Sequence, residues 1–107
     1  MKVLKFRKIL SELILTHKKN TTWRLFDDKN ISVDDLVSLV VWETGKEFAT
    51  ARITSVIEKP FCELPPDAFE GHEIFFSEKE LLETYKEYYK TEINQSTPFK
   101  VIKFEVL

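Results

Sequence analysis

Glycine is scarce in this sequence: only two of its 107 residues are Gly, at positions 45 and 71. Phosphate-binding loops of P-loop nucleotidases and the dinucleotide-binding turn each need two or three closely spaced glycines, because their backbone approaches the phosphates closely. The sequence therefore excludes both of these nucleotide-binding motifs.

Cysteine and long apolar runs are scarce as well. The single Cys62 excludes a disulfide framework and favours a reducing, cytoplasmic location. No run approaches the roughly 18 apolar residues of a membrane-spanning helix, and charges interrupt the start of the chain too often for a signal peptide. We therefore expect a cytoplasmic protein with no membrane partner. Because the Cys, His and acidic residues from Cys62 to Glu73 lack zinc-like spacing, we expect no metal and no other cofactor.

The chain also lacks a strong excess of one charge. Its 16 Lys and Arg against 18 Asp and Glu give a net charge of −2, which argues against a strongly cationic nucleic-acid binder. The distribution is uneven, however. Residues 1–24 contain seven Lys or Arg and one acid, whereas residues 60–107 contain five Lys and ten acids. Either these are ordinary solvated faces, or a local cationic site lies on an acidic body.

Hydrophobic residues, nine Phe among them, make up 43% of the chain, enough for the core of one domain spanning residues 1–107. Apolar periodicity predicts helices over residues 7–17 and 77–90 and a short helical turn at 67–69. Alternating or β-branched segments predict strands over residues 3–6, 21–25, 36–42, 47–58 and 99–107. This order does not alternate as a parallel α/β sheet would, so it favours an α+β fold: a small, partly open barrel of about five strands with two main flanking helices.

Local signals mark where several of these elements begin and end. Asn20 is the expected terminator of the first helix, because Asn tolerates a left-handed conformation. Gly45 supplies a hairpin turn. Ser77 and Glu80 form a capping box, and Phe76 with Leu81 fits a hydrophobic staple.

The densest group of chemically useful residues lies between the first helix and the next strand. On a strand, Thr22 and Arg24 share one face while Trp23 faces the opposite side. We expect Trp23 to enter the core, so Lys19, Thr22 and Arg24 converge on a cleft suited to an anion or a polar planar ligand. The alternative is solvated lysines and an arginine in a surface ion pair.

Two further groups have alternative readings. Glu73 precedes apolar residues and is a candidate acid or base beside His72, or else an exposed loop carboxylate beside a hydrogen-bonded histidine. The stripe Tyr85, Tyr88 and Tyr89 either stacks on bases or forms core with a wet rim.

The segment from Ile14 to Arg24 resembles the signature of the ASCH domain family, in the PUA-like superfamily. That signature is an apolar helix end, a "GKKT-T-R"-like turn and a strand. Further similar segments follow in order along nearly the whole chain: Val33–Val37, Thr50–Val56, Glu70–Glu73 and Val101–Phe104. The family's turn glycine corresponds to His17 or Lys18, and its "GD" pair to Asp34 and Asp35.

This resemblance implies a small β-barrel with a cleft between barrel and helices. It implies binding of RNA or a small nucleoside-like ligand, with Lys18, Arg24 and His72 as further ligand-binding residues. It implies an alternative as well: an amidohydrolase that deacetylates 4-acetylcytidine, with Lys19, Thr22 and Glu73 as the catalytic set. In that reaction Lys19 must be neutral to activate Thr22. Either Glu73 or His72 corresponds to the acidic residue of the family, depending on the alignment.

Overall fold

The computed structural model describes residues 1–26, 29–72, 75 and 77–107. Its strands are β1 (Lys2–Phe6), β2 (Thr21–Arg24), β3 (Leu36–Val41), β4 (Glu47–Pro60) and β5 (Pro98–Val106). Its α-helices are α1 (Lys8–Leu15) and α2 (Glu78–Tyr89), with short 3₁₀ segments η1 (Phe61–Glu63) and η2 (Pro66–Phe69) between β4 and α2. The predicted order of elements is confirmed, with small differences at their ends.

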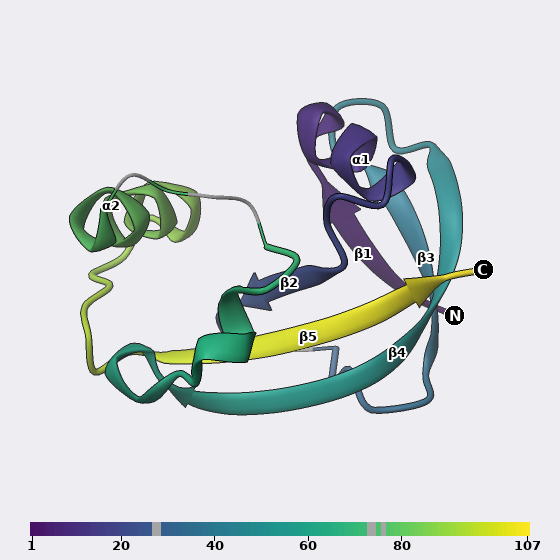
Figure 1. The fold of residues 1–107 in the computed structure, drawn as a ribbon. Coiled ribbons are helices and arrows are strands. Elements are labelled where there is room, and N and C mark those ends of the chain that lie inside the picture. Colours follow the sequence, from purple (N-terminus) through teal and green to yellow (C-terminus); the bar gives the residue numbers. More distant parts are fainter. Residues whose placement is uncertain (27–28, 73–74, 76) are drawn as a thin grey trace.

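The five strands form one mixed sheet in the order β1-β3-β4-β5-β2. The β1–β3 pair is parallel and the other pairs are antiparallel. Register shifts interrupt β4 near Ile53 and β3 near Leu39, and such irregularities increase strand twist. The sheet curls into a half-barrel, so the α+β fold class predicted from sequence is confirmed. Figure 1 shows α1 and α2 towards opposite ends of the molecule, with β2 passing between them.

Two hydrophobic clusters fill this frame. The first, here called the aliphatic cluster, packs β1, β3, β4 and α1 around ten buried residues: Leu4, Phe6, Ile14, Ile31, Val37, Leu39, Ala51, Ile53, Ile102 and Phe104. The second, the aromatic cluster, lies under α2 and the 3₁₀ segments: Trp23, Leu25, Phe61, Ala68, Leu81, Tyr85, Ile93, Phe99 and Val101. β5 contributes to both clusters, so one strand joins the two halves of the core.

The first helix ends earlier than the sequence predicts. His17 has a φ of 63°, the N–H of His17 donates to the Ile14 carbonyl, and the N–H of Lys18 donates to the Leu13 carbonyl. These two bonds around a left-handed residue form a Schellman motif. Asn20 as helix terminator is therefore wrong, because Asn20 already lies at the entry to β2.

The predicted turn at Gly45 and the predicted capping residue Ser77 are both found. Gly45 has a φ of 72° in the turn between β3 and β4. The Ser77 hydroxyl accepts from the N–H of Glu80 at 3.1 Å, as a capping residue does. The predicted staple partner Phe76 lies outside the described residues. No helix among the described residues is long and apolar enough to cross a bilayer.

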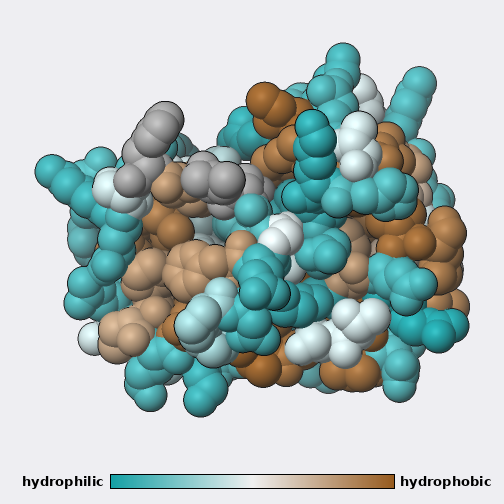
Figure 2. Space-filling view, in the orientation of Figure 1, coloured by the Kyte–Doolittle hydropathy of each residue, from teal (hydrophilic) through white to brown (hydrophobic). Residues whose placement is uncertain are grey.

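The surface is mostly polar on the face that Figure 2 shows. Hydrophilic residues (teal) dominate its outline, and a tan hydrophobic patch lies in its left half, on the side where Figure 1 places α2.

Candidate functional site: a cationic and aromatic pocket

The turn that follows α1 brings a lysine into the interior. Lys19 is 2% exposed, and its Nζ donates to the Thr21 carbonyl at 2.7 Å. A buried ammonium group requires such polar partners, because burial without them is costly. The Schellman motif at His17 therefore does more than end α1: it turns the chain so that Lys19 points inward while Lys18 stays exposed.

Strand β2 then distributes its side chains as predicted. Trp23 enters the aromatic cluster, and its Nε1 donates to the Ala68 carbonyl at 3.0 Å. Thr22 and Arg24 lie on the wall of a pocket, where the Arg24 Nε donates to the Thr22 hydroxyl at 3.3 Å. The Arg24 guanidinium also donates to the Lys5 carbonyl at 2.8 Å, which ties β2 to β1 across the pocket.

A loop holds the start of β2 from the other side. The N–H groups of Asn20 and Thr21 donate to the Gly71 carbonyl at 2.9 and 3.2 Å, and the Thr21 hydroxyl donates to the Glu70 carbonyl at 2.7 Å. Gly71 has a φ of 74°, and a Cβ at this position would lie 1.8 Å from Asn20 Oδ1. Only glycine therefore fits this approach without a shift.

His72 lies behind the pocket wall. Its ring stacks on Trp23, with the centroids 4.0 Å apart, and its Nε2 lies 3.2 Å from the Tyr85 hydroxyl. Trp23 and Tyr85 both line the pocket, whereas His72 lines a second cavity of about 520 Å³. His72 therefore supports two pocket residues from behind.

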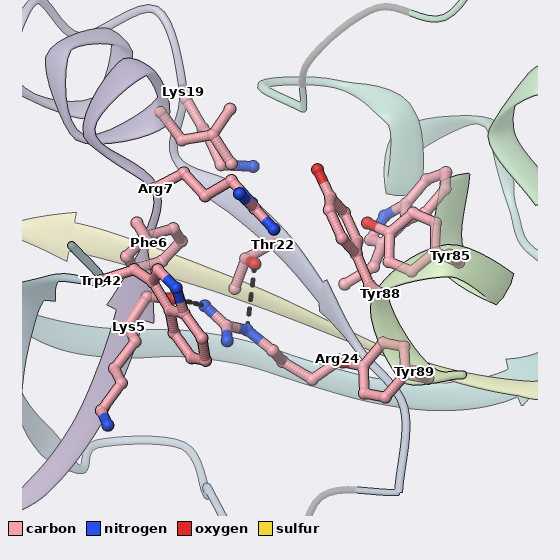
Figure 3. A pocket seen from close by; sticks show the side chains of 12 residues that line it. Lys5, Phe6, Arg7, Lys19, Thr22, Arg24, Trp42, Tyr85, Tyr88 and Tyr89 are labelled. Carbon is pink, nitrogen blue, oxygen red and sulfur yellow. Dashed lines mark hydrogen bonds between the residues drawn. The ribbon is translucent and has the colours of Figure 1, made fainter. Parts of the chain in front are cut away.

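The pocket has a volume of about 350 Å³ and lies between the end of β1, β2 and α2. Four cationic side chains line it: Lys5, Arg7, Lys19 and Arg24. Six aromatic residues line it too: Phe6, Trp23, Trp42, Tyr85, Tyr88 and Tyr89. Figure 3 shows the nitrogens of Arg7, Lys19 and Arg24 directed into the part of the pocket where the Thr22 hydroxyl lies. Such a lining suits a ligand that combines negative or polar groups with a flat ring.

The four cations fall into two pairs. Lys19 and Arg24, the inner pair, each donate to a backbone carbonyl. Lys5 and Arg7, the outer pair, rest on aromatic rings: Lys5 Nζ lies 5.6 Å from the Trp42 centroid, and Arg7 Cζ lies 5.3 Å from the Tyr88 centroid. These rings are 59% and 47% exposed, so the outer pair forms the mouth of the pocket.

Of the residues that the sequence suggested for a site, the structure brings Lys19, Thr22 and Arg24 to this pocket. It does not bring Lys18 or His72 there. Glu73 lies outside the described residues. The choice between Glu73 and His72 for the acidic position therefore stays a prediction. Within the described part of the chain, no group of three or more His, Cys, Asp and Glu residues could hold a metal ion.

The sequence alone does not indicate the mouth of the pocket. Lys5, Arg7 and Trp42 lie in no local motif that points to a site, although Lys5 and Arg7 belong to the basic N-terminal segment. Charge asymmetry was thus the one signal that could have found them. Trp42 ends a predicted strand and carries no such signal. The tyrosine stripe divides: Tyr85 is buried, Tyr88 is exposed at the mouth, and the Tyr89 hydroxyl accepts from the N–H of Leu25.

Comparison with solved structures identifies the fold as ASCH-like. An ASCH domain from Lactobacillus crispatus superposes with a TM-score of 0.73 at 17% identity, over 98% of this chain and 79% of that one. A DUF984 protein from Enterococcus faecalis gives a TM-score of 0.81 at 15% identity, over 99% and 79%. The ASCH protein from Zymomonas mobilis gives 0.66 at 13% identity, over 96% and 65%. No protein-family model and no curated protein matches the sequence.

The conformation of the turn bears on the resemblance drawn from the sequence. A residue that stands in the place of a turn glycine is expected to have a positive φ. His17 has that conformation. The structure therefore favours His17 over Lys18 as the counterpart of the glycine, which leaves Lys19 and Thr22 together within the turn and strand that line the pocket.

Proposed function

We propose that the pocket binds a nucleoside-like or nucleotide-like ligand, free or as part of RNA. The observation that carries this proposal is that three cationic side chains, Arg7, Lys19 and Arg24, are directed into one pocket of about 350 Å³. The mouth of that pocket carries Lys5 and the exposed Trp42 and Tyr88 rings. Aromatic rings stack on bases, and Lys and Arg side chains bind phosphate or base oxygens. A pocket of this size suits one small ligand.

Overall charge supports a local site rather than capture of a long polyanion. A protein that neutralises many phosphates has a broad basic surface and an affinity that falls steeply with salt. This chain carries a net charge of −2, and four of the seven cations in the segment 1–24 line one pocket. The ligand is therefore a single nucleotide unit, at most the exposed base of an RNA strand.

Titration tests this proposal directly. Trp23 and Trp42 both line the pocket, so tryptophan fluorescence should report binding of cytidine, of cytidine 5′-monophosphate and of a short single-stranded RNA, each at low and high salt. Arg24→Gln should weaken binding, because Arg24 supplies one of the cationic groups of the pocket and ties β2 to β1 across it. Absence of binding by all three ligands at low salt would contradict the proposal.

One observation favours a second candidate, the amidohydrolase. Lys19 and Thr22 both line the pocket, and the Thr22 hydroxyl lies among cations that can stabilise a developing oxyanion. This reaction requires Lys19 in its neutral form, whereas the binding proposal uses it as a cation. The Thr22 Oγ attacks the acetyl carbonyl of 4-acetylcytidine, Lys19 takes the hydroxyl proton, and the C–N bond breaks to release cytidine. Water then hydrolyses the acetyl ester on Thr22. Glu73, which the resemblance implies as the third member of the catalytic set, would donate a proton to the leaving amine or orient the base ring.

Turnover separates the two candidates. If the second candidate is correct, the natural protein releases acetate and cytidine from 4-acetylcytidine, and Thr22→Ala and Lys19→Ala abolish release. Lys18→Ala is the matched control, since Lys18 is adjacent but exposed and does not line the pocket. If the natural protein binds cytidine but does not cleave 4-acetylcytidine, the amidohydrolase hypothesis is wrong and the binding hypothesis is retained.

A further inference from the structure

The mouth of the pocket has an arrangement that binding alone does not require. Each exposed ring at the mouth carries a cation: Arg7 on Tyr88 and Lys5 on Trp42. Cation–π contacts of this kind at exposed sites are weak compared with an ion pair to a phosphate. The two cations are thus held near the pocket but are easily released.

The base of a ligand and the Arg7 guanidinium compete for the same face of the Tyr88 ring. Arg7 and Tyr88 both line the pocket, and they come from the N-terminal boundary of α1 and the last turn of α2. A base that stacks on the pocket side of Tyr88 must therefore displace the guanidinium. Among the described residues, the Arg7 side chain makes no hydrogen bond or ion pair that would resist this movement.

We propose that the ligand is a nucleoside monophosphate, and that its base exchanges with Arg7 on the Tyr88 ring while the released guanidinium binds its phosphate. This inference rests on the proposed function and narrows it. The base takes the stacking surface, and Arg7 joins the inner cations Lys19 and Arg24, towards which it already points (Figure 3). A single ligand thus fills both positions.

The exchange couples the two parts of the ligand. A nucleoside alone displaces Arg7 from the Tyr88 ring without offering the guanidinium an anion. The complex then gains the contact between base and ring but loses the contact between Arg7 and ring. Inorganic phosphate alone binds the cations without covering the ring. Only a molecule with both groups gains both interactions, which singles out the monophosphate from its components.

The test compares cytidine, cytidine 5′-monophosphate and inorganic phosphate by calorimetric titration. We expect the monophosphate to bind about tenfold or more tightly than cytidine, the gain typical of one charge-assisted contact. Arg7→Gln should remove most of this preference. Lys8→Gln is the matched control, because Lys8 is the next residue, is exposed and does not line the pocket; it should keep the preference.

A second readout follows Arg7 itself. Its side-chain NMR signals should carry the ring-current shift of Tyr88 in the free protein and lose that shift when the monophosphate binds. Both variants change exposed side chains, and thermal unfolding checks that they fold.

Four results would overturn the inference. Equal affinity for cytidine and its monophosphate would overturn it while leaving the proposed function intact. Loss of preference in Lys8→Gln as large as in Arg7→Gln would reduce the effect to general surface charge. Arg7 signals that keep their ring-current shift in the complex would exclude the exchange. Failure of both cytidine and its monophosphate to bind would remove the proposed function together with the inference.

Discussion

The aliphatic and aromatic clusters have similar numbers of buried residues but different tasks. In the aliphatic cluster, β1 pairs with β3 along its whole length and β3 pairs with the first part of β4, and the buried side chains are mainly Leu, Ile and Val. The aromatic cluster gathers Trp23, Phe61, Tyr85 and Phe99 under α2, with His72 stacked on Trp23. The pocket borders both clusters, but its polar aromatic wall comes from the second.

The two clusters differ in the chemical groups that their side chains can present to a ligand. An aliphatic side chain ends in methyl groups, so a cluster of them can only exclude water. Trp and Tyr combine a large apolar body with a hydrogen-bonding group. The aromatic half can therefore contribute to the core and present hydroxyl groups and ring faces to a ligand at the same time.

The largest expected effect tests this division. Trp23→Leu and Ile53→Ala should each lower the free energy of unfolding by about 3 to 4 kcal/mol, since each removes a buried side chain of its cluster. Urea denaturation measures both losses. At concentrations where both variants are folded, Trp23→Leu should abolish ligand binding and Ile53→Ala should preserve it. Equal binding losses in the two variants would break the comparison.

The second prediction concerns the loop that joins the aromatic half to β2. Gly71→Ala should cost about 2 to 3 kcal/mol of unfolding free energy, because it combines a left-handed φ with a clash against Asn20. Gly45→Ala is the matched control: its φ is 72°, but no atom lies within 4 Å of the added Cβ, so only the backbone cost of about 1 kcal/mol applies. Similar losses from the two changes would show that the Gly71 contact contributes nothing.

The third prediction is a substitution that stabilises the protein. His17→Gly should raise the free energy of unfolding by about 0.5 to 1 kcal/mol, because glycine adopts the left-handed conformation of the helix end without steric cost. Thr16→Gly serves as control: this residue has a φ of −92° and its hydroxyl donates to the Glu12 carbonyl, so the change should destabilise. Thermal unfolding of both variants measures the signs.

The smallest effect belongs to the aliphatic half. Its charged edge contains Asp35, whose pKa is lowered by a hydrogen bond from Lys2 at 2.7 Å and a second from the N–H of Ser32. A lowered folded-state pKa means that the ionised carboxylate stabilises the fold above the unfolded-state pKa, near 4, and that this contribution disappears as the pH falls through the folded-state pKa.

Asp35→Asn should therefore be slightly less stable than the natural protein at neutral pH and no less stable in acid, below the folded-state pKa of Asp35. Unfolding measured across this range gives the comparison, with Lys2→Gln expected to reduce the same pH-dependent difference without removing it, since the N–H of Ser32 still donates to Asp35. A stability gap that stays constant with pH would contradict the assignment. Ligand binding at neutral pH should stay unchanged, since neither residue lines the pocket.

Most of the fold could be predicted from sequence because its signals are local. The alternation around Ile53, the turn at Gly45 and the cap at Ser77 each depend on neighbouring residues, so periodicity and turn chemistry located the elements. The end of α1 was misplaced because Asn is the usual left-handed residue where glycine is rare. His17 takes that conformation instead, and the chain turns there so that Lys19 is buried.

The candidate site could be predicted only in part. Lys19, Thr22 and Arg24 lie close together in the sequence, so the alternation of one strand was enough to place Thr22 and Arg24 together. Arg7 and Tyr88 lie near opposite ends of the chain, and no local pattern indicates that the start of α1 faces the end of α2. His72 has the same limitation: its stacking on Trp23 depends on how the loop after η2 returns to β2.

The sequence by itself determined the elements, the fold class and the basic character of the N-terminal segment, because these depend on composition and on short-range periodicity. Only the tertiary structure decided that four of the cations in that segment share one pocket with aromatic rings that include Trp42, next to β3, and three tyrosines of α2. The physical reason is that charge is a property of the chain, whereas a site requires side chains distant in sequence to meet. That meeting is set by the curl of the sheet, which carries α1 and α2 to either side of β2.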